Sequence, residues 1–203
     1  AGVAAALGAR VHVLELGDRP MARALSHTTS QRFREAHEGW GVTFDFEQGL
    51  QRIAGEDGQV RRVITADGRA IDADLVVYGI GVIPNTALAE AAGLTIENGI
   101  RVDAQLQTED PFISAVGDAV TFPCVQLDSA PTRLESVQNA ADQARCLAAR
   151  LTGTSAPYVA TPWFWSDQGD LKLQIVGMSN GYNNTVELEV ADSVKVKSSH
   201  GLP

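Results

Sequence analysis

Apolar positions recur along this 203-residue chain with two different periods, and the two periods alternate from one segment to the next. A spacing of three to four predicts helices, and strict alternation predicts strands. The N-terminal third is expected to contain helix, strand, helix and strand, followed by a small antiparallel meander with glycine turns. The predicted ranges, in that order, are 1–7, 10–15, 26–38, 42–46, 51–65 and 69–71.

Two mostly apolar runs, 74–78 and 112–116, predict strands that are buried on both faces. Each run ends at a glycine, where a ligand can approach the backbone closely. Between and after them we expect shorter elements, a loop and one long helix. These are a helix over 86–92, a strand over 100–103, a loop over 123–133, a helix over 134–151 and a strand over 171–176. The mixed order predicts an α/β fold.

Charge and composition narrow the function classes. The formal net charge of −9 argues against a nucleic-acid partner, which would favour a basic face. No apolar run approaches the ~20 residues of a membrane span. The two cysteines, Cys124 and Cys146, form no C-x-x-C motif, so we expect reduced thiols in a cytoplasmic protein, with no metal site.

The first segments indicate the second half of a Rossmann βαβ unit: a helix closed by Gly8, then a strand that ends in Glu15. An acid at this position accepts hydrogen bonds from the ribose of NAD and disfavours the 2′-phosphate of NADP. Arg19 and Arg23 follow, where they are either adenosine or pyrophosphate contacts or simply solvated. The glycine loop that belongs ~20 residues before the acid would lie before Ala1, so we expect the chain to be a fragment.

The segment 108–118, Thr-Glu-Asp-Pro-Phe-Ile-Ser-Ala-Val-Gly-Asp, ends in Gly117 and Asp118. By themselves, these two residues predict only a strand that stops in a turn. The whole pattern resembles the second flavin motif of flavoproteins with two dinucleotide-binding domains, in which the aspartate holds a ribityl hydroxyl of FAD. Similarly, Gly79-Ile-Gly-Val-Ile-Pro-Asn85 resembles the segment that closes the NAD domain of that superfamily.

Two further strings make the resemblance specific: Leu134-Glu-Ser-Val-Gln-Asn139 and Pro162-Trp-Phe-Trp-Ser-Asp-Gln168. With the motifs above, they resemble the NADH:ferredoxin and NADH:rubredoxin reductases of bacterial oxygenase systems, the putidaredoxin-reductase-like family. The resemblance extends from Ala1 to about Tyr182, and we could not align the segment after Tyr182.

The resemblance implies an FAD enzyme that takes hydride from NADH and passes single electrons to a ferredoxin or rubredoxin. It implies no catalytic side chain, because the flavin carries the chemistry. The implied cofactor-binding residues are Glu15, Arg19, Arg23, Ile80, Gly81, Gly117, Asp118, Glu135, Ser136, Val137 and Trp165. Ile80 and Gly81 would face the nicotinamide, Glu135, Ser136 and Val137 both rings, and Trp165 the isoalloxazine.

We therefore predict a partial Rossmann-like NAD domain over 1–84, part of an FAD-binding domain over 85–156 and the start of a C-terminal α+β domain over 157–203. The sequence does not indicate an oligomeric state. Two alternatives stay open. The chain is a catalytically incompetent fragment, or it belongs to a related NADH-dependent flavoenzyme such as an NADH oxidase or a nitrite-reductase subunit.

Overall fold

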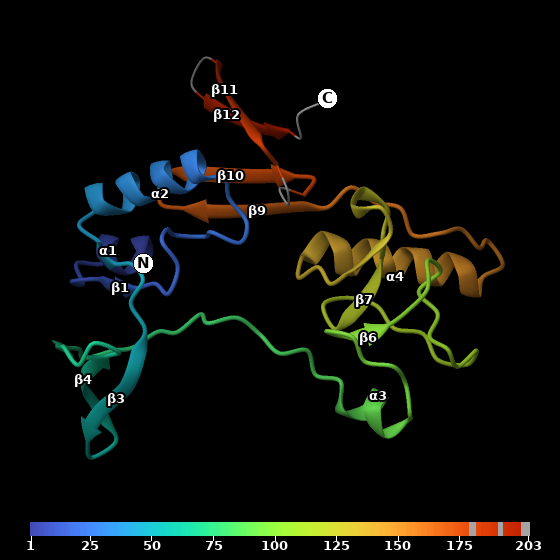
Figure 1. The fold of residues 1–203 in the computed structure, drawn as a ribbon, viewed down its shortest axis with the longest axis horizontal. Helices are drawn as coiled ribbons and strands as arrows, with labels where there is room; N and C mark the ends of the chain where they lie inside the picture. The colour runs from blue at the N-terminus through green and yellow to red at the C-terminus, as the bar shows by residue number, and fades with distance from the viewer. Residues whose placement is uncertain (179–181, 191–192, 200–203) are drawn as a thin grey trace. The chain divides into compact units, whose positions relative to one another are not determined.

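The computed structural model of the chain describes residues 1–178, 182–190 and 193–199 (Figure 1). Its contacts divide the chain into two compact units. Unit 1 is Ala1–Gly79 with Gln168–Asp170 and Ser179–Pro203, and unit 2 is Ile80–Asp167 with Leu171–Met178. Helices and strands alternate in both, as expected for the α/β class. The division into three domains stays a prediction.

Unit 1 begins with the expected βαβ arrangement. Strands β1 and β2 pair in parallel, with His12 opposite Thr43, and helix α2 connects them. Ser26 caps α2 because its hydroxyl accepts a hydrogen bond from the Thr29 N–H at 3.3 Å. The elements are α1 Gly2–Ala6, β1 His12–Leu14, α2 His27–Gly39 and β2 Thr43–Asp45.

The predicted meander forms the second part of unit 1. Strands β3, β4 and β5 make one antiparallel sheet with Asp57 and Gly58 in the first turn, both at positive φ. A further antiparallel hairpin, β11 with β12, lies in the segment that we could not align. The bounds are β3 Leu50–Glu56, β4 Gln59–Thr65, β5 Ala70–Asp72, β11 Asn184–Val190 and β12 Ser193–Ser199.

Unit 2 is a small sheet packed with one long helix. Strand β7 pairs in parallel with β6 and antiparallel with β8, and α4 lies beside them (Figure 1). The bounds are α3 Ala87–Ala91, β6 Ile100–Arg101, β7 Val120–Cys124, the 3-10 turn η1 Val125–Leu127, β8 Ala130–Thr132, α4 Val137–Leu151, β9 Trp163–Gln168 and β10 Leu171–Val176. The buried core consists of Val102, Leu106, Val120, Phe122, Cys124, Leu134 and Tyr158.

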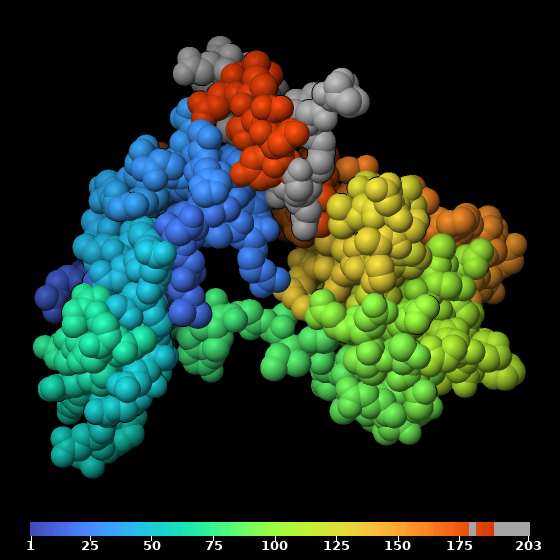
Figure 2. Space-filling model, viewed as in Figure 1, coloured from blue at the N-terminus to red at the C-terminus, as the bar shows by residue number. Residues whose placement is uncertain are grey.

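Two predicted strands are absent. Residues 74–78 form no strand, and the side chain of Val77 is 86% exposed. The apolar row continues through Ile83, which is 93% exposed, and Figure 2 shows this green segment uncovered on the face in view. Residues 112–116 also lack strand structure, and Phe112 is 95% exposed. The physical reason is the same in both cases: a strand needs a hydrogen-bonded neighbour, and the described residues supply none beyond one isolated bridge, Gln107 to Ser114.

The predicted loop over 123–133 was also wrong. It contains the end of β7, the turn η1 and all of β8. Strand β7 contains Pro123, although proline is disfavoured inside strands. Here Pro123 lies opposite Pro131, and neither residue has an N–H to donate across this pair.

Candidate functional site

The predicted motif at Gly117 and Asp118 forms a tight turn at the start of β7. The Val120 N–H donates to the Gly117 carbonyl at 3.2 Å, which closes the turn. Gly117 is buried and has a φ of +86°, a conformation that glycine adopts without strain. The Asp118 side chain is exposed and forms none of the hydrogen bonds found within the described residues. The turn therefore presents a free carboxylate on a fixed backbone.

The helix α4 begins near this turn. Ser136 is its N-cap, and the Ser136 hydroxyl accepts the Asn139 N–H at 3.1 Å. The first N–H groups of a helix have no partner inside the helix, and the helix dipole adds positive potential there. Val137, the first helical residue, is exposed. The start of α4 can therefore receive a negatively charged or hydrogen-bond-accepting group.

Arg133 joins the turn to the segment that leads into α4. One guanidinium nitrogen of Arg133 lies 3.1 Å from the Asp118 carbonyl oxygen and 2.6 Å from Glu135 Oε1. The Arg133 side chain is only 8% exposed, whereas Glu135 and Asp118 lie at the surface. As a result, two of the predicted motifs, Gly117-Asp118 and Glu135-Ser136, are held together by one side chain.

One face of α4 covers the segment that precedes the turn. Gln143 is fully buried, and its Oε1 accepts the Gly117 N–H at 2.7 Å. Two turns later, Arg150 donates to the Ser114 hydroxyl and to the Gln107 side chain. Positions seven residues apart share a helix face, so residues 114–117 lie along α4. The helix holds this segment together with the isolated bridge from Gln107 to Ser114.

Strand β9 is attached to the same end of α4. The Trp163 N–H donates to the Gln138 side chain at 3.1 Å. Trp163 and Trp165 stack with centroids 5.0 Å apart, while Phe164 packs on the core. Trp165 remains 47% exposed. The aromatic string thus presents two indole rings on the face opposite the core.

A second group of predicted residues lies in unit 1. Glu15 follows β1, and one of its carboxylate oxygens accepts the Gly17 N–H at 2.8 Å, so the other stays available. Arg19 is engaged with Asp18 at 2.9 Å and with the Ala22 carbonyl. Arg23 is exposed. Of the two arginines, Arg23 is therefore the freer to contact a ligand.

Ile80 and Gly81 are not brought to either group by any described contact. They lie in the exposed extended segment, where Gly81 has a φ of +97°. Their role toward a nicotinamide stays a prediction. The structure thus assembles Gly117, Asp118, Glu135, Ser136 and Val137 closely, and it places Trp165 on a strand anchored to the same helix end.

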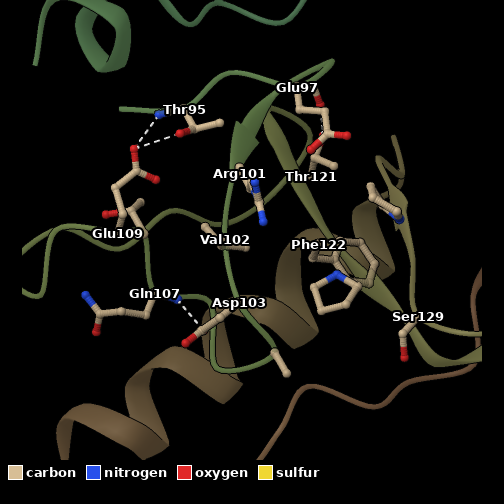
Figure 3. A pocket seen from close by; sticks show the side chains of 14 residues that line it. Thr95, Glu97, Arg101, Val102, Asp103, Gln107, Glu109, Thr121, Phe122 and Ser129 are labelled. Atoms are coloured by element: carbon tan, nitrogen blue, oxygen red, sulfur yellow. Dashed lines mark hydrogen bonds between the residues drawn. The ribbon is translucent and has the colours of Figure 1, made fainter. Parts of the chain in front are cut away.

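A surface groove of about 820 Å³ lies elsewhere in unit 2 and includes none of the predicted residues (Figure 3). Two of its carboxylates, Glu109 and Asp103, are occupied by the chain itself. Glu109 accepts the Thr95 N–H at 2.6 Å and the Thr95 hydroxyl, and these hydrogen bonds lower the pKa of Glu109. Asp103 accepts the N–H groups of Gln105 and Gln107. The residues that line this groove do not indicate a particular ligand.

The residues that sequence reasoning missed are Arg133 and Gln143. Arg133 stands two positions before Glu135, inside a predicted loop. Gln143 lies inside a helical pattern, and its residue type alone gave no sign of a contact with the turn. Both act through contacts that local patterns do not reveal.

The residues present fit a flavin dinucleotide. Asp118 offers an acceptor for hydroxyl groups, Gly117 has no side chain to obstruct the approach, and the start of α4 offers N–H donors. This set of groups suits the ribityl chain and the carbonyl side of an isoalloxazine. Glu15 and Arg23 supply an acceptor and a cation suited to an adenosine ribose and a phosphate.

Comparison with known proteins agrees with this fold. The sequence profile described as pyridine nucleotide-disulphide oxidoreductase matches residues 1–144. The chain therefore belongs to the pyridine nucleotide-disulphide oxidoreductase family. A second profile, described as reductase C-terminal, matches residues 163–196. The match continues past Tyr182, so the expectation that the resemblance ends there was wrong.

The predicted resemblance to ferredoxin-type reductases is confirmed by individual relatives. Rhodocoxin reductase from Rhodococcus erythropolis is 49% identical over 92% of this chain and 43% of its own length. The crystal structure of the ferredoxin reductase for the CYP199A2 system of Rhodopseudomonas palustris matches with a TM-score of 0.94 and 46% identity, over 98% of this chain and 50% of that one.

A third match is the covalent putidaredoxin reductase–putidaredoxin complex, with a TM-score of 0.87 and 37% identity over 95% of this chain and 47% of that one. These solved structures confirm the predicted α/β class. The chain spans about half the length of the relatives that it matches. Within the described residues, no helix combines the length and apolar character that crossing a bilayer requires.

Proposed function

We propose that this chain carries the flavin-facing part of an FAD-dependent reductase that passes electrons from NADH to a small iron–sulfur protein, a ferredoxin or a rubredoxin. The observation that carries the proposal is the Arg133 link between the Asp118 turn and the start of α4. It joins a free carboxylate to a helix N-terminus, as binding of a ribityl-isoalloxazine requires. FAD, when bound, supplies the hydride acceptance and the single-electron release.

On the flavin side, each residue has a distinct task. Asp118 accepts hydrogen bonds from ribityl hydroxyls, and Gly117 lets the chain approach the backbone. The α4 N-terminus, with Ser136 and Val137, stabilises negative charge on the ring system. Glu135 and Trp165 would border a bound ring, and Trp165 would limit access of water and oxygen to it.

On the nicotinamide side, Glu15 accepts hydrogen bonds from the adenosine ribose and repels the extra phosphate of NADPH. Arg23, and to a lesser extent Arg19, neutralise the pyrophosphate. Ile80 and Gly81 would contact the nicotinamide half of a bound NADH, because a glycine with positive φ has no side chain to obstruct the approach.

The partner is proposed from the relatives, since one matched structure is a reductase in complex with putidaredoxin. A cytoplasmic location is proposed from the thiols: Cys124 and Cys146 are both free, as suits a reducing compartment. No observation in the described residues favours the NADH oxidase or the nitrite-reductase alternative.

The test is flavin retention by the purified 203-residue chain after incubation with FAD and desalting. We expect a visible flavin spectrum that NADH bleaches faster than NADPH, with Glu15→Gln reducing the difference. Asp118→Ala should weaken FAD binding by about tenfold or more, because a hydrogen bond to a charged group is lost. The matched control, Asp170→Ala, removes an exposed carboxylate from the β9–β10 turn and should leave binding unchanged.

Equal FAD affinity in Asp118→Ala and the parent chain would contradict the assigned role of Asp118. A parent chain that retains no flavin would contradict autonomous binding and would favour the incompetent-fragment alternative.

A further inference from the structure

The turn from Gly117 to Val120, called the 117–120 turn below, has its key backbone groups satisfied by the chain itself. The Gly117 N–H donates to Gln143, the Gly117 carbonyl accepts from Val120, and the Asp118 carbonyl accepts from Arg133. The neighbouring Ala119 carbonyl accepts the Ile100 N–H at 2.8 Å. The Asp118 carboxylate has none of the hydrogen bonds found within the described residues.

Gln143 is an unexpected choice for a buried helix position. Its Nε2 is buried without a partner among the described residues, which costs free energy that a leucine would avoid. Its Oε1 holds the Gly117 N–H at 2.7 Å. The hydrogen bond to the turn offsets this cost.

Arg133 likewise combines an unpartnered buried nitrogen with a hydrogen bond to the turn. Its Nε is buried without a partner among the described residues, while its terminal nitrogen serves the Asp118 carbonyl and Glu135. Two polar side chains therefore form hydrogen bonds with successive residues of the 117–120 turn. Gln143, on α4, binds Gly117, and Arg133, before α4, binds Asp118. Neither contact involves the Asp118 carboxylate, which is exposed.

We infer that Gln143 and Arg133 are positioning residues that hold the 117–120 turn in its ligand-binding conformation before any cofactor arrives. The inference deepens the proposed function and rests on it for the identity of the ligand. A preformed turn lowers the ordering cost of binding, because the backbone of Asp118 is already fixed. Loss of either hydrogen bond should increase the local mobility of the turn while the core of unit 2 stays folded.

The experiment is amide hydrogen exchange by NMR on the cofactor-free 203-residue chain. Gln143→Leu should speed exchange of the Gly117 amide by about tenfold, the scale of one lost hydrogen bond, and should also speed that of Val120. The reference is the Val102 amide, which donates to the Thr121 carbonyl in the core of unit 2 and should change far less.

Three variants complete the design. Gln143→Glu keeps the acceptor and should retain the protection of Gly117. Ala144→Leu places the same new side chain at the exposed neighbouring position and should leave Gly117 unchanged. Arg133→Met should speed exchange at Val120 more than at Gly117, and it carries the test if Gln143→Leu does not fold.

Equal acceleration of Gly117 and Val102 in Gln143→Leu would overturn the inference, because it would show general destabilisation. Unchanged exchange at Gly117 and Val120 would overturn it as well. FAD titration of the same proteins separates this inference from the proposed function. If the parent chain binds FAD, Gln143→Leu should weaken binding about tenfold. If the parent chain binds none, the autonomous-binding proposal fails and the exchange rates still decide the inference.

Discussion

The Tyr158 hydroxyl stabilises the start of α4. Its removal should change the free energy of unfolding in two ways, one at pH 8 and one at alkaline pH. Its hydroxyl donates to Asn139 Oδ1 at 3.1 Å, and Asn139 Nδ2 donates to the Leu134 carbonyl. Asn139 is buried, so Tyr158→Phe leaves its side-chain oxygen without a partner. The expected loss in the free energy of unfolding is about 1–3 kcal/mol at pH 8, the cost of a buried unsatisfied acceptor.

The second magnitude concerns alkaline pH. Burial raises the pKa of Tyr158 to about 12, from its ordinary value of about 10. Between these values the unfolded chain has released the phenolic proton and the folded chain retains it, so stability falls as the pH rises. A difference of about two units corresponds to roughly 2–3 kcal/mol, fully present below pH 10 and lost by about pH 12. Tyr158→Phe lacks this loss, so the gap between the two proteins should narrow or reverse.

The assay is urea unfolding monitored by tryptophan fluorescence at intervals from pH 8 to pH 11.5. A Trp40→Phe background restricts the signal to Trp163 and Trp165, which lie in unit 2. A difference below 0.5 kcal/mol at pH 8 would refute the role assigned to the hydrogen bond on the scale used above. A difference that stays constant up to the highest pH would refute the raised pKa.

Two further predictions concern stability and association. Ser136→Ala should cost about 1 kcal/mol of unfolding free energy through the lost N-cap, while Ser136→Asp should retain most of it, as measured by the same urea titration. The exposed row that includes Val77 and Ile83 should bind the dye ANS and promote self-association. Val77→Lys with Ile83→Lys should reduce both dye binding and self-association, measured by dye fluorescence and by sedimentation at several protein concentrations. Unchanged values would show that this row is not the surface responsible for self-association.

Elements with local signals were predictable from the sequence. Ser26 and Ser136 precede helical patterns, and both cap the helices that follow. The meander over 51–71 was predictable because its glycine turns join neighbouring segments. Asp118 and Gly117 were identified as a site candidate because a resemblance supplied what periodicity could not.

Features that depend on distant partners were not predictable. The apolar runs at 74–78 and 112–116 have the composition of buried strands, but composition does not state whether a neighbour is present to pair with them. Strand β7 was missed because its pairing with β6 and β8 outweighs the unfavourable Pro123. Arg133 and Gln143 escaped notice because their value lies in contacts 15 and 26 residues away.

Those same separations bear on how the protein is made. The contacts that shape the 117–120 turn span 26 residues or fewer, and the Arg150 contact to Ser114 spans 36. Short loops close at low entropic cost, and structures rich in such contacts fold fast. This part of the chain can therefore take its shape soon after Tyr158 leaves the ribosome. Cofactor capture then follows folding as a separate bimolecular step, whose rate depends on cofactor concentration and not on the speed of translation.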